Sequence, residues 1–137
     1  MSRIIAIDYG TKRCGLAESD DLKMIASPLQ TLSPGELFPF LENYHKKYTV
    51  ELFVLGDPKR WDGTASSVSS EIESFCRRLK EKFPGIAIEK TDERFSSVMA
   101  TDALLAAGAK KKTRADKSNI DKVSAAIILQ SYLGRRK

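Results

Sequence analysis

The apolar and polar positions near the start of the chain predict three strands. A short apolar run, residues 4–7, ends in the turn signal Asp8-Tyr9-Gly10-Thr11. Residues 14–19 and 24–32 have the composition of two further strands. We therefore expect the chain to open with three antiparallel strands.

A helix is expected next, because Ser33 and Glu36 have the spacing of a capping box and Pro34 suits the first helical position. Apolar positions then recur at helical spacing until a continuous apolar run at residues 52–55. Such a run is typical of a strand that is buried on both faces. The pattern therefore predicts a helix and then a central strand.

The second half of the chain alternates between helices and a strand. Thr64 is a candidate cap for a second helix that ends at Pro84-Gly85, and residues 86–88 follow as a fifth strand. Two more helices are expected at about 96–107 and 119–133. This order predicts an α/β fold in which a five-stranded mixed sheet has helices on both faces.

Length and composition are consistent with that fold. The chain has 137 residues, of which 42% are hydrophobic and 30% charged, so we expect residues 1–137 to form one globular domain. No apolar run approaches the length of a membrane span, and the first residues lead directly into a strand. These features predict a cytoplasmic protein that does not bind a membrane.

The net charge of +5 favours a polyanionic partner such as nucleic acid. Much of this charge falls in a basic loop at residues 107–117, which contains five cationic residues and one acidic residue. They are Lys110, Lys111, Lys112, Arg114 and Lys117, with Asp116 as the acid. The backbone of a nucleic acid could lie there, although such charge runs are also typical of solvated loops.

The cysteine and histidine content argues against a disulfide framework and against a zinc site. Cys14 and Cys76 are far apart in the sequence and form no metal-binding pair, so we expect two buried, reduced thiols. His45, the single histidine, lies in a helical pattern and is expected at the surface. The sequence also lacks a P-loop and any convincing nucleophilic triad.

Three carboxylates occupy positions that favour a common site. Asp8 directly follows the first strand, Glu93 lies just beyond the fifth, and Asp121 begins the last helix on the face expected to pack on the sheet. Taken singly, each has an ordinary explanation as a turn residue, a partner of Arg94 or a complement to the helix dipole. Together they predict a cleft at one end of the sheet.

Three carboxylates in one cleft repel one another unless cations are present, so this arrangement predicts divalent metal binding. Mg²⁺ is the natural occupant because it binds a few carboxylates and coordinates substrate phosphates. Two such ions can activate a water and stabilise a leaving oxygen. This chemistry suits phosphodiester hydrolysis.

Five sequence strings in order resemble the YqgF (RuvX) family and span almost the whole chain. They are IAIDYGTKRCGLAESD, ASPLQTL, LGDPKRWDGTASS, TDERFSS and IDKVSAAIILQSYL. The resemblance implies a ribonuclease H-like fold and a nuclease. Members of the family are described as nucleases of the 16S rRNA precursor or as Holliday junction resolvases.

The resemblance also implies the roles of individual residues. Asp8, Glu93 and Asp121 match the acidic motif positions of the family and would be the catalytic, metal-binding residues. Asp8 would bridge two Mg²⁺ or Mn²⁺ ions, and the other two acids would each complete one side. Arg13 and Arg94 are candidates to bind phosphate oxygens, together with the basic loop.

Two residues of the middle motif have no clear role from sequence. Family members commonly have an apolar residue where Asp57 stands between Gly56 and Pro58. Asp57 either joins the acidic cleft or simply ends the strand. Trp61 either stacks on a base or anchors a turn.

The function that we expect is an endonuclease that processes the 5′ end of pre-16S rRNA in ribosome biogenesis. A Holliday junction resolvase needs the same acids and the same basic surface, so it remains an alternative. A non-catalytic nucleic-acid-binding module is a further alternative. A two-lobed ATPase is disfavoured because the chain provides only one lobe. The ribosome is a further candidate partner, and both a monomer and a homodimer remain open.

Overall fold

The computed structural model describes residues 2–10, 12–57, 69–92 and 117–135. At positions 57, 69–70, 92, 117–121 and 135 only the backbone is described. The described elements are β1 (Arg3–Asp8), β2 (Cys14–Ser19), β3 (Ala26–Leu32), α1 (Pro34–Tyr48), β4 (Val50–Asp57), α2 (Ser69–Lys82), β5 (Ala87–Asp92) and α5 (Lys117–Arg135).

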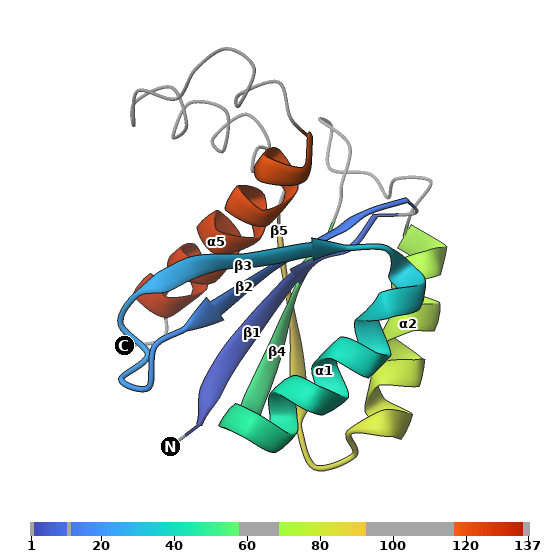
Figure 1. The fold of residues 1–137 in the computed structure, drawn as a ribbon, viewed down its shortest axis with the longest axis horizontal. Coiled ribbons are helices and arrows are strands. Elements are labelled where there is room, and N and C mark those ends of the chain that lie inside the picture. The colour runs from blue at the N-terminus through green and yellow to red at the C-terminus, as the bar shows by residue number, and fades with distance from the viewer. Residues whose placement is uncertain (1, 11, 58–68, 93–116, 136–137) are drawn as a thin grey trace.

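The five strands form one mixed sheet in the order β3-β2-β1-β4-β5. β1 pairs antiparallel with β2 and parallel with β4, and β5 continues the parallel half. In the register, Leu55 of β4 pairs with Ile7 on one side and Lys90 on the other. The parallel strands β1, β4 and β5 therefore have their carboxyl ends at the same end of the sheet (Figure 1). This mixed five-stranded sheet confirms the predicted fold class.

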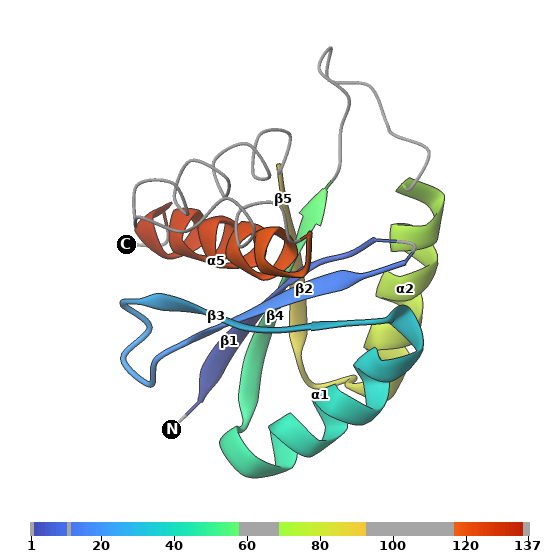
Figure 2. The same ribbon diagram turned by 45° about the horizontal axis from the view of Figure 1, so that its top comes forward.

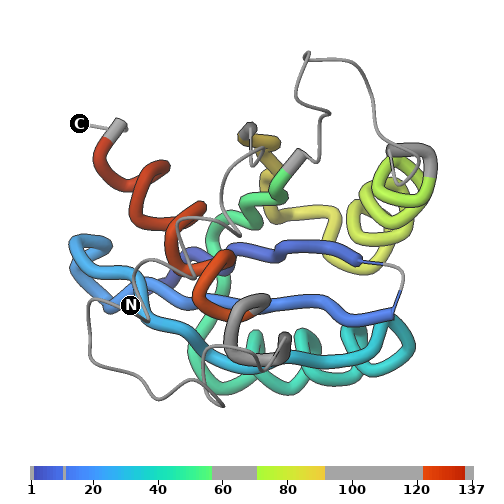
Figure 3. The backbone as a smooth tube through the Cα atoms, turned by 90° about the horizontal axis from the view of Figure 1, so that it is seen from above, coloured from blue at the N-terminus to red at the C-terminus, as the bar shows by residue number. Residues whose placement is uncertain are grey.

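Helices cover both faces of this sheet. α1 and α2 pack on one face, and α5 crosses the other (Figures 1 and 2). In the view from above, α2 and α5 lie apart on either side of the strands (Figure 3). Alternate residues of β1 supply the two cores, because Ile5 and Ile7 contact the α1–α2 side while Ile4 and Ala6 contact the α5 side.

The start of α1 is built as the sequence predicts. The Glu36 carboxylate accepts hydrogen bonds from the Ser33 backbone N–H at 3.1 Å and from the Ser33 hydroxyl at 2.7 Å. These bonds stabilise the ionised carboxylate and lower the pKa of Glu36. A local capping signal therefore determines where the helix begins.

The third strand starts later than predicted, at Ala26 rather than at residue 24. The Asp20 carboxylate accepts hydrogen bonds from the backbone N–H groups of Met24 at 2.8 Å and Ile25 at 3.0 Å. This bonding holds both residues in the turn between β2 and β3. The observed helix α5 contains the predicted 119–133 segment, whereas Thr64 and the helix predicted at 96–107 lie outside the described residues.

The two cysteines are reduced thiols with different environments. Cys14 is fully buried, as expected, whereas Cys76 is only partly buried, which corrects the expectation of two buried thiols. Burial still raises the pKa of the Cys76 thiol. Of the helices that the structure describes, none combines the length and hydropathy that a bilayer crossing needs.

Candidate active site

Asp8 is the last residue of β1, a central strand with partners on both sides. Successive side chains of a strand point to opposite faces, and Ile4 and Ala6 pack against α5. Asp8 continues this alternation, so its half-buried carboxylate belongs to the α5 face. The strand therefore presents an acid at the end of the sheet beneath the last helix.

The next residue anchors this strand end from the opposite face. Tyr9 is 9% exposed, and its ring stacks on Phe75 of α2 with 4.8 Å between centroids. Burial raises the pKa of the Tyr9 hydroxyl, so the group is neutral near pH 7. Sequence analysis missed this support, and an aromatic residue directly after Asp8 is the only local signal for it.

The turn after Tyr9 leaves no room for a side chain at Gly10. A Cβ atom placed there would lie 2.4 Å from the Arg13 carbonyl oxygen. The Cys14 thiol donates a hydrogen bond to the Gly10 carbonyl oxygen at 3.5 Å, which closes the same turn. This tight turn carries Lys12 and Arg13, both exposed, just beyond Asp8. The phosphate contact expected of Arg13 remains a prediction.

The structure describes the elements next to the other two predicted acids. Glu93 immediately follows β5, which ends at the same edge as β1, but it lies outside the described residues. Asp121 falls in the first turns of α5, which Figure 1 shows at the end of the sheet where β1 and β4 end. The structure describes its backbone and not its side chain. The convergence of the three carboxylates therefore remains a prediction.

Residues one turn beyond Asp121 show how closely α5 approaches the sheet. Ala125 is fully buried against the sheet, together with Ala6 of β1 and Ala17 of β2. The Ser124 hydroxyl is also buried, and among the described residues it has no hydrogen-bond partner. The small side chains let the helix start lie near the strand that carries Asp8.

The donor chemistry of the predicted site suits a hard divalent cation. Asp8, Glu93 and Asp121 would all offer carboxylate oxygens, the ligands that Mg²⁺ and Mn²⁺ prefer. The part of the chain that the structure describes contains no cluster of three potential ligands, since only Asp8 of the predicted set has a described side chain. The residues present therefore fit such an ion by type.

Most of the residues predicted to contact nucleic acid lie outside the described ranges, so these contacts remain predictions. They are Arg94, Lys110, Lys111, Lys112 and Arg114, together with Trp61. Asp57 ends β4, and its backbone pairs with that of Asp92 at the end of β5. Only the backbone is described at both positions, so a role of Asp57 in the acidic cleft remains a prediction.

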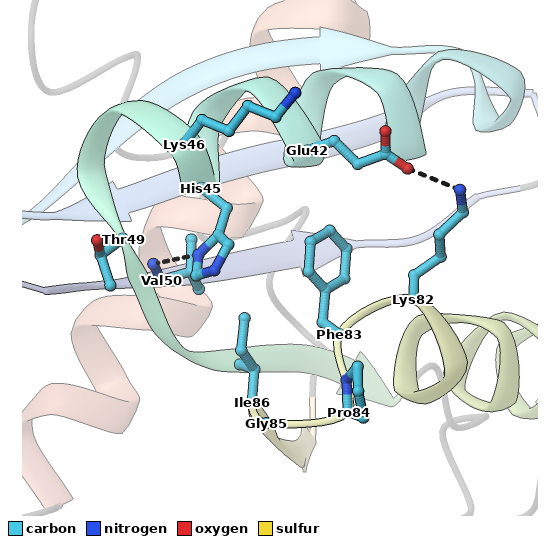
Figure 4. Close-up of a pocket in the computed structure, with 10 residues that line it drawn as sticks. All are labelled: Glu42, His45, Lys46, Thr49, Val50, Lys82, Phe83, Pro84, Gly85 and Ile86. Carbon is cyan, nitrogen blue, oxygen red and sulfur yellow. Dashed lines mark hydrogen bonds and ion pairs between the residues drawn. The ribbon is translucent and has the colours of Figure 1, made fainter.

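A cavity of about 720 Å³ lies at the opposite end of the sheet, between the end of α1 and the α2–β5 connection (Figure 4). Glu42 and Lys82 form an ion pair of 2.7 Å at its rim. The His45 Nδ1 atom accepts a hydrogen bond from the Val50 backbone N–H at 2.9 Å, and its ring forms a T-shaped contact with that of Phe83. His45 is therefore a partly buried structural residue, which corrects the expectation of a surface position.

Comparison with known proteins relates the chain to one family along nearly its whole length. The RuvX family model, described as Holliday junction resolvase, matches residues 2–135. A protein of Christiangramia forsetii is 49% identical over 133 residues, which cover 97% of this chain and 98% of the relative. A protein of Bacteroides fragilis is 47% identical over 137 residues, covering 100% and 99%. Both are named "Putative pre-16S rRNA nuclease".

Two solved structures share the fold. The structure described as T. thermophilus RuvC in complex with Holliday junction substrate has a TM-score of 0.57 and 13% identity, covering 98% of this chain and 96% of its own. The Holliday junction resolvase of fowlpox virus has a TM-score of 0.56 and 14% identity, covering 96% and 98%. At these identities the likeness concerns the fold alone, whereas the family match spans nearly the whole sequence. The chain therefore belongs to the RuvX family and has a ribonuclease H-like fold.

Proposed function

We propose that this chain is a metal-dependent endonuclease that hydrolyses phosphodiester bonds in structured nucleic acid, and that its substrate is the 5′ end of pre-16S rRNA. The observation that carries the proposal is the position of Asp8, at the end of a central strand on the face covered by α5. The names of the full-length relatives support the RNA substrate.

Three residues of this chain would hold the metal. Asp8 would contribute from β1, Glu93 from the segment after β5 and Asp121 from α5. When bound, Mg²⁺ or Mn²⁺ would activate a water for attack on phosphorus and stabilise the leaving oxygen. Arg13, in the tight turn beyond Asp8, would bind a phosphate oxygen and orient the scissile group. Arg94 and the basic loop would extend this contact along the backbone.

Residues 1–137 would act as a single nuclease domain in the cytoplasm, where ribosomal RNA precursors are processed. Binding through several phosphates should weaken steeply as salt increases. The maturing ribosome is the context in which such a substrate is presented, so it is the partner that we favour.

The proposal is tested by cleavage of a 16S rRNA precursor with Mg²⁺ or Mn²⁺, comparing the wild type with Asp8→Asn. Loss of a metal ligand should lower activity by more than the roughly 10- to 100-fold typical of lost outer-shell partners. RNA binding and thermal stability should change little. Full activity in Asp8→Asn would contradict the proposed site.

Asp21→Asn is the matched control, because it makes the same chemical change at the other end of the sheet. The Asp21 side chain is 47% exposed and pairs with Arg3 at 3.1 Å, a kind of contact that contributes little to stability. This variant should retain full cleavage. A contaminating nuclease would cleave equally in all three preparations, so the series separates the two sources of activity.

A four-way DNA junction is the substrate of the second candidate function, which the description of the matching family favours. Resolution of a junction requires two symmetric cuts and hence two active sites. Junction cleavage lost in Asp8→Asn, with no cleavage of the RNA precursor, would select this function. Binding of both substrates without cleavage of either, even with assembling ribosomal subunits added, would indicate the non-catalytic module.

A further inference from the structure

A second cavity, of about 300 Å³, lies between edge strand β3 and the exposed side of α1. We call it the aromatic pocket. Its walls combine three aromatic side chains with two carboxamides and one amine, a combination that differs from an ordinary apolar groove. These residues are Phe40, Tyr44, Tyr48, Gln30, Asn43 and Lys47.

The aromatic side chains form a continuous row along α1. Phe40, Tyr44 and Tyr48 are spaced four residues apart, so they follow one side of the helix. The centroids of Phe40 and Tyr44 are 6.2 Å apart with 29° between planes, and those of Tyr44 and Tyr48 are 5.0 Å apart. Tyr44 is 6% exposed and belongs to the core, but Phe40 and Tyr48 are only partly buried. The row therefore offers aromatic surface to a ligand.

A fixed carboxylate forms part of the pocket lining. Glu18 Oε1 accepts hydrogen bonds from the Tyr44 hydroxyl at 2.9 Å and from the Arg3 guanidinium at 2.7 Å. The Arg3 guanidinium also lies 4.1 Å from the centroid of the Tyr48 ring. These contacts orient the carboxylate and the ring before any ligand arrives, which reduces the entropy lost on binding.

The remaining polar groups surround the aromatic row. Gln30 and Asn43 are exposed, and each carboxamide can both donate and accept hydrogen bonds. The Lys47 amine is also exposed, 5.2 Å from the centroid of the Tyr48 ring. A planar heterocycle that carries a phosphate would satisfy all three kinds of group.

We propose that the aromatic pocket binds one unpaired nucleobase together with its phosphate. The base stacks on the exposed aromatic surface, its polar edge bonds to the carboxamides, and the phosphate pairs with Lys47. The volume lies at the lower limit of ligand pockets, which suits one nucleotide and excludes a duplex. The proposal deepens the proposed function, on which it rests, by assigning the substrate a single-stranded flank.

The position of the pocket agrees with such a flank. Glu18 pairs with Ile5, three residues before Asp8 on β1. At about 3.3 Å per residue, the pocket is displaced roughly 10 Å from Asp8 along the strand direction, and it lies beyond β2, at edge strand β3. The pocket is on the α1 side of the sheet, whereas Asp8 belongs to the α5 face, so several unpaired nucleotides next to the cleaved bond would reach it by passing around β3.

Two probes distinguish a strand of RNA from a free nucleotide. We would titrate the protein with nucleoside 5′-monophosphates and with a short single-stranded RNA, following the side-chain amide signals of Gln30 and Asn43 by NMR. Shifts with both probes would show that the base and its phosphate suffice. Shifts with RNA alone would show that neighbouring nucleotides contribute. Absence of shifts with both probes would overturn the proposal.

Variants of exposed residues test the same contacts without disturbing the core. The double variant Gln30→Ala, Asn43→Ala should weaken binding of the single-stranded RNA by about tenfold, a modest value for lost base contacts. Lys47→Ala should weaken it and lower the salt dependence by about one phosphate contact. Lys46→Ala is the matched control, because this neighbouring, exposed lysine lines the cavity of Figure 4 instead. Equal losses of RNA affinity for Lys46→Ala and Lys47→Ala would show that only the overall positive charge matters, and would overturn the proposal.

The Asp8→Asn protein separates this proposal from the proposed nuclease function. Pocket shifts that persist in this variant while cleavage is lost would support both. An active wild type without pocket shifts would overturn the pocket alone. Pocket shifts in a wild type that cleaves no substrate would support the pocket and overturn the nuclease.

Discussion

The two faces of the sheet are packed with side chains of very different size. The α1–α2 face contains large aromatic and aliphatic groups, among them the fully buried Phe53 and Phe75. The α5 face includes Ala6, Ala17 and Ala125, all without exposed surface. Large side chains bury more apolar area, whereas small ones allow backbones to approach closely.

This difference predicts that one face mainly stabilises the fold and the other mainly positions the active site. The α1–α2 face should supply most of the hydrophobic stabilisation and, through the Tyr9–Phe75 stack, should also hold the end of β1. The α5 face sets how near the helix that carries Asp121 comes to Asp8. Variants on the two faces should therefore affect folding and cleavage in different proportions.

The largest loss of stability is expected from Phe75→Ala, which removes a side chain that is 1% exposed. Replacing a buried phenylalanine by alanine typically costs about 3 to 5 kcal/mol. Urea denaturation measures the change in the free energy of unfolding. Phe75→Leu is the control that retains most of the volume. A loss below about 1 kcal/mol for the alanine variant would contradict the assigned role of this face.

Ala125→Leu should cost less stability but should displace α5. Overpacking a filled core typically costs about 1 to 3 kcal/mol. We expect cleavage by the folded protein to fall by tenfold or more, because a shift of about 1 Å at a catalytic group can reduce the rate about a hundredfold. Ser131→Leu, at an exposed position of the same helix, is the control. Unchanged cleavage in a folded Ala125→Leu protein would show that α5 does not position the site.

Gly10→Ala tests the tight turn that follows Asp8 and Tyr9 at the end of β1. The added Cβ would meet the Arg13 carbonyl oxygen at 2.4 Å, so the backbone must move, at a cost of about 1 kcal/mol or more. We expect a lower cleavage rate, because the turn follows Asp8 directly. At Gly35, in the first turn of α1, a Cβ atom meets nothing within 4 Å. Gly35→Ala should therefore leave cleavage unchanged, and the free energy of unfolding should stay the same or rise slightly.

The smallest effect is expected from Tyr44→Phe and depends on pH. Burial raises the pKa of Tyr44 from 10.0 to about 12. Between pH 10 and 12 the unfolded chain loses this proton while the folded protein keeps it, so folding stability decreases as the pH rises. Below pH 10 the group adds no pH dependence.

Denaturation of the wild type and Tyr44→Phe at neutral and alkaline pH measures this contribution. At pH 7 the variant should be less stable by about 0.5 to 1.5 kcal/mol, because it loses the hydrogen bond to Glu18. The difference between the two proteins should shrink above pH 10. A difference that stays constant to pH 12 would contradict the raised pKa.

Features that depend on neighbouring residues could be predicted from the sequence. The capping box of Ser33 and Glu36, the buried β4 strand and the helical pattern before Leu133 each predicted an element that the structure contains. The order of these elements was enough to predict a five-stranded mixed sheet, and five motif strings were enough to identify the family. Such signals are readable because bonding and periodicity over a few residues set local conformation.

Contacts between residues far apart in the sequence became visible only in the folded structure. The sequence around Tyr9 does not identify Phe75 as its partner, and the sequence around His45 does not identify Phe83. The aromatic pocket likewise exists only because the register of β2 and β3 brings Glu18 and Gln30 beside α1. These contacts follow from how the layers pack, and packing depends on the shapes of side chains far apart in the chain.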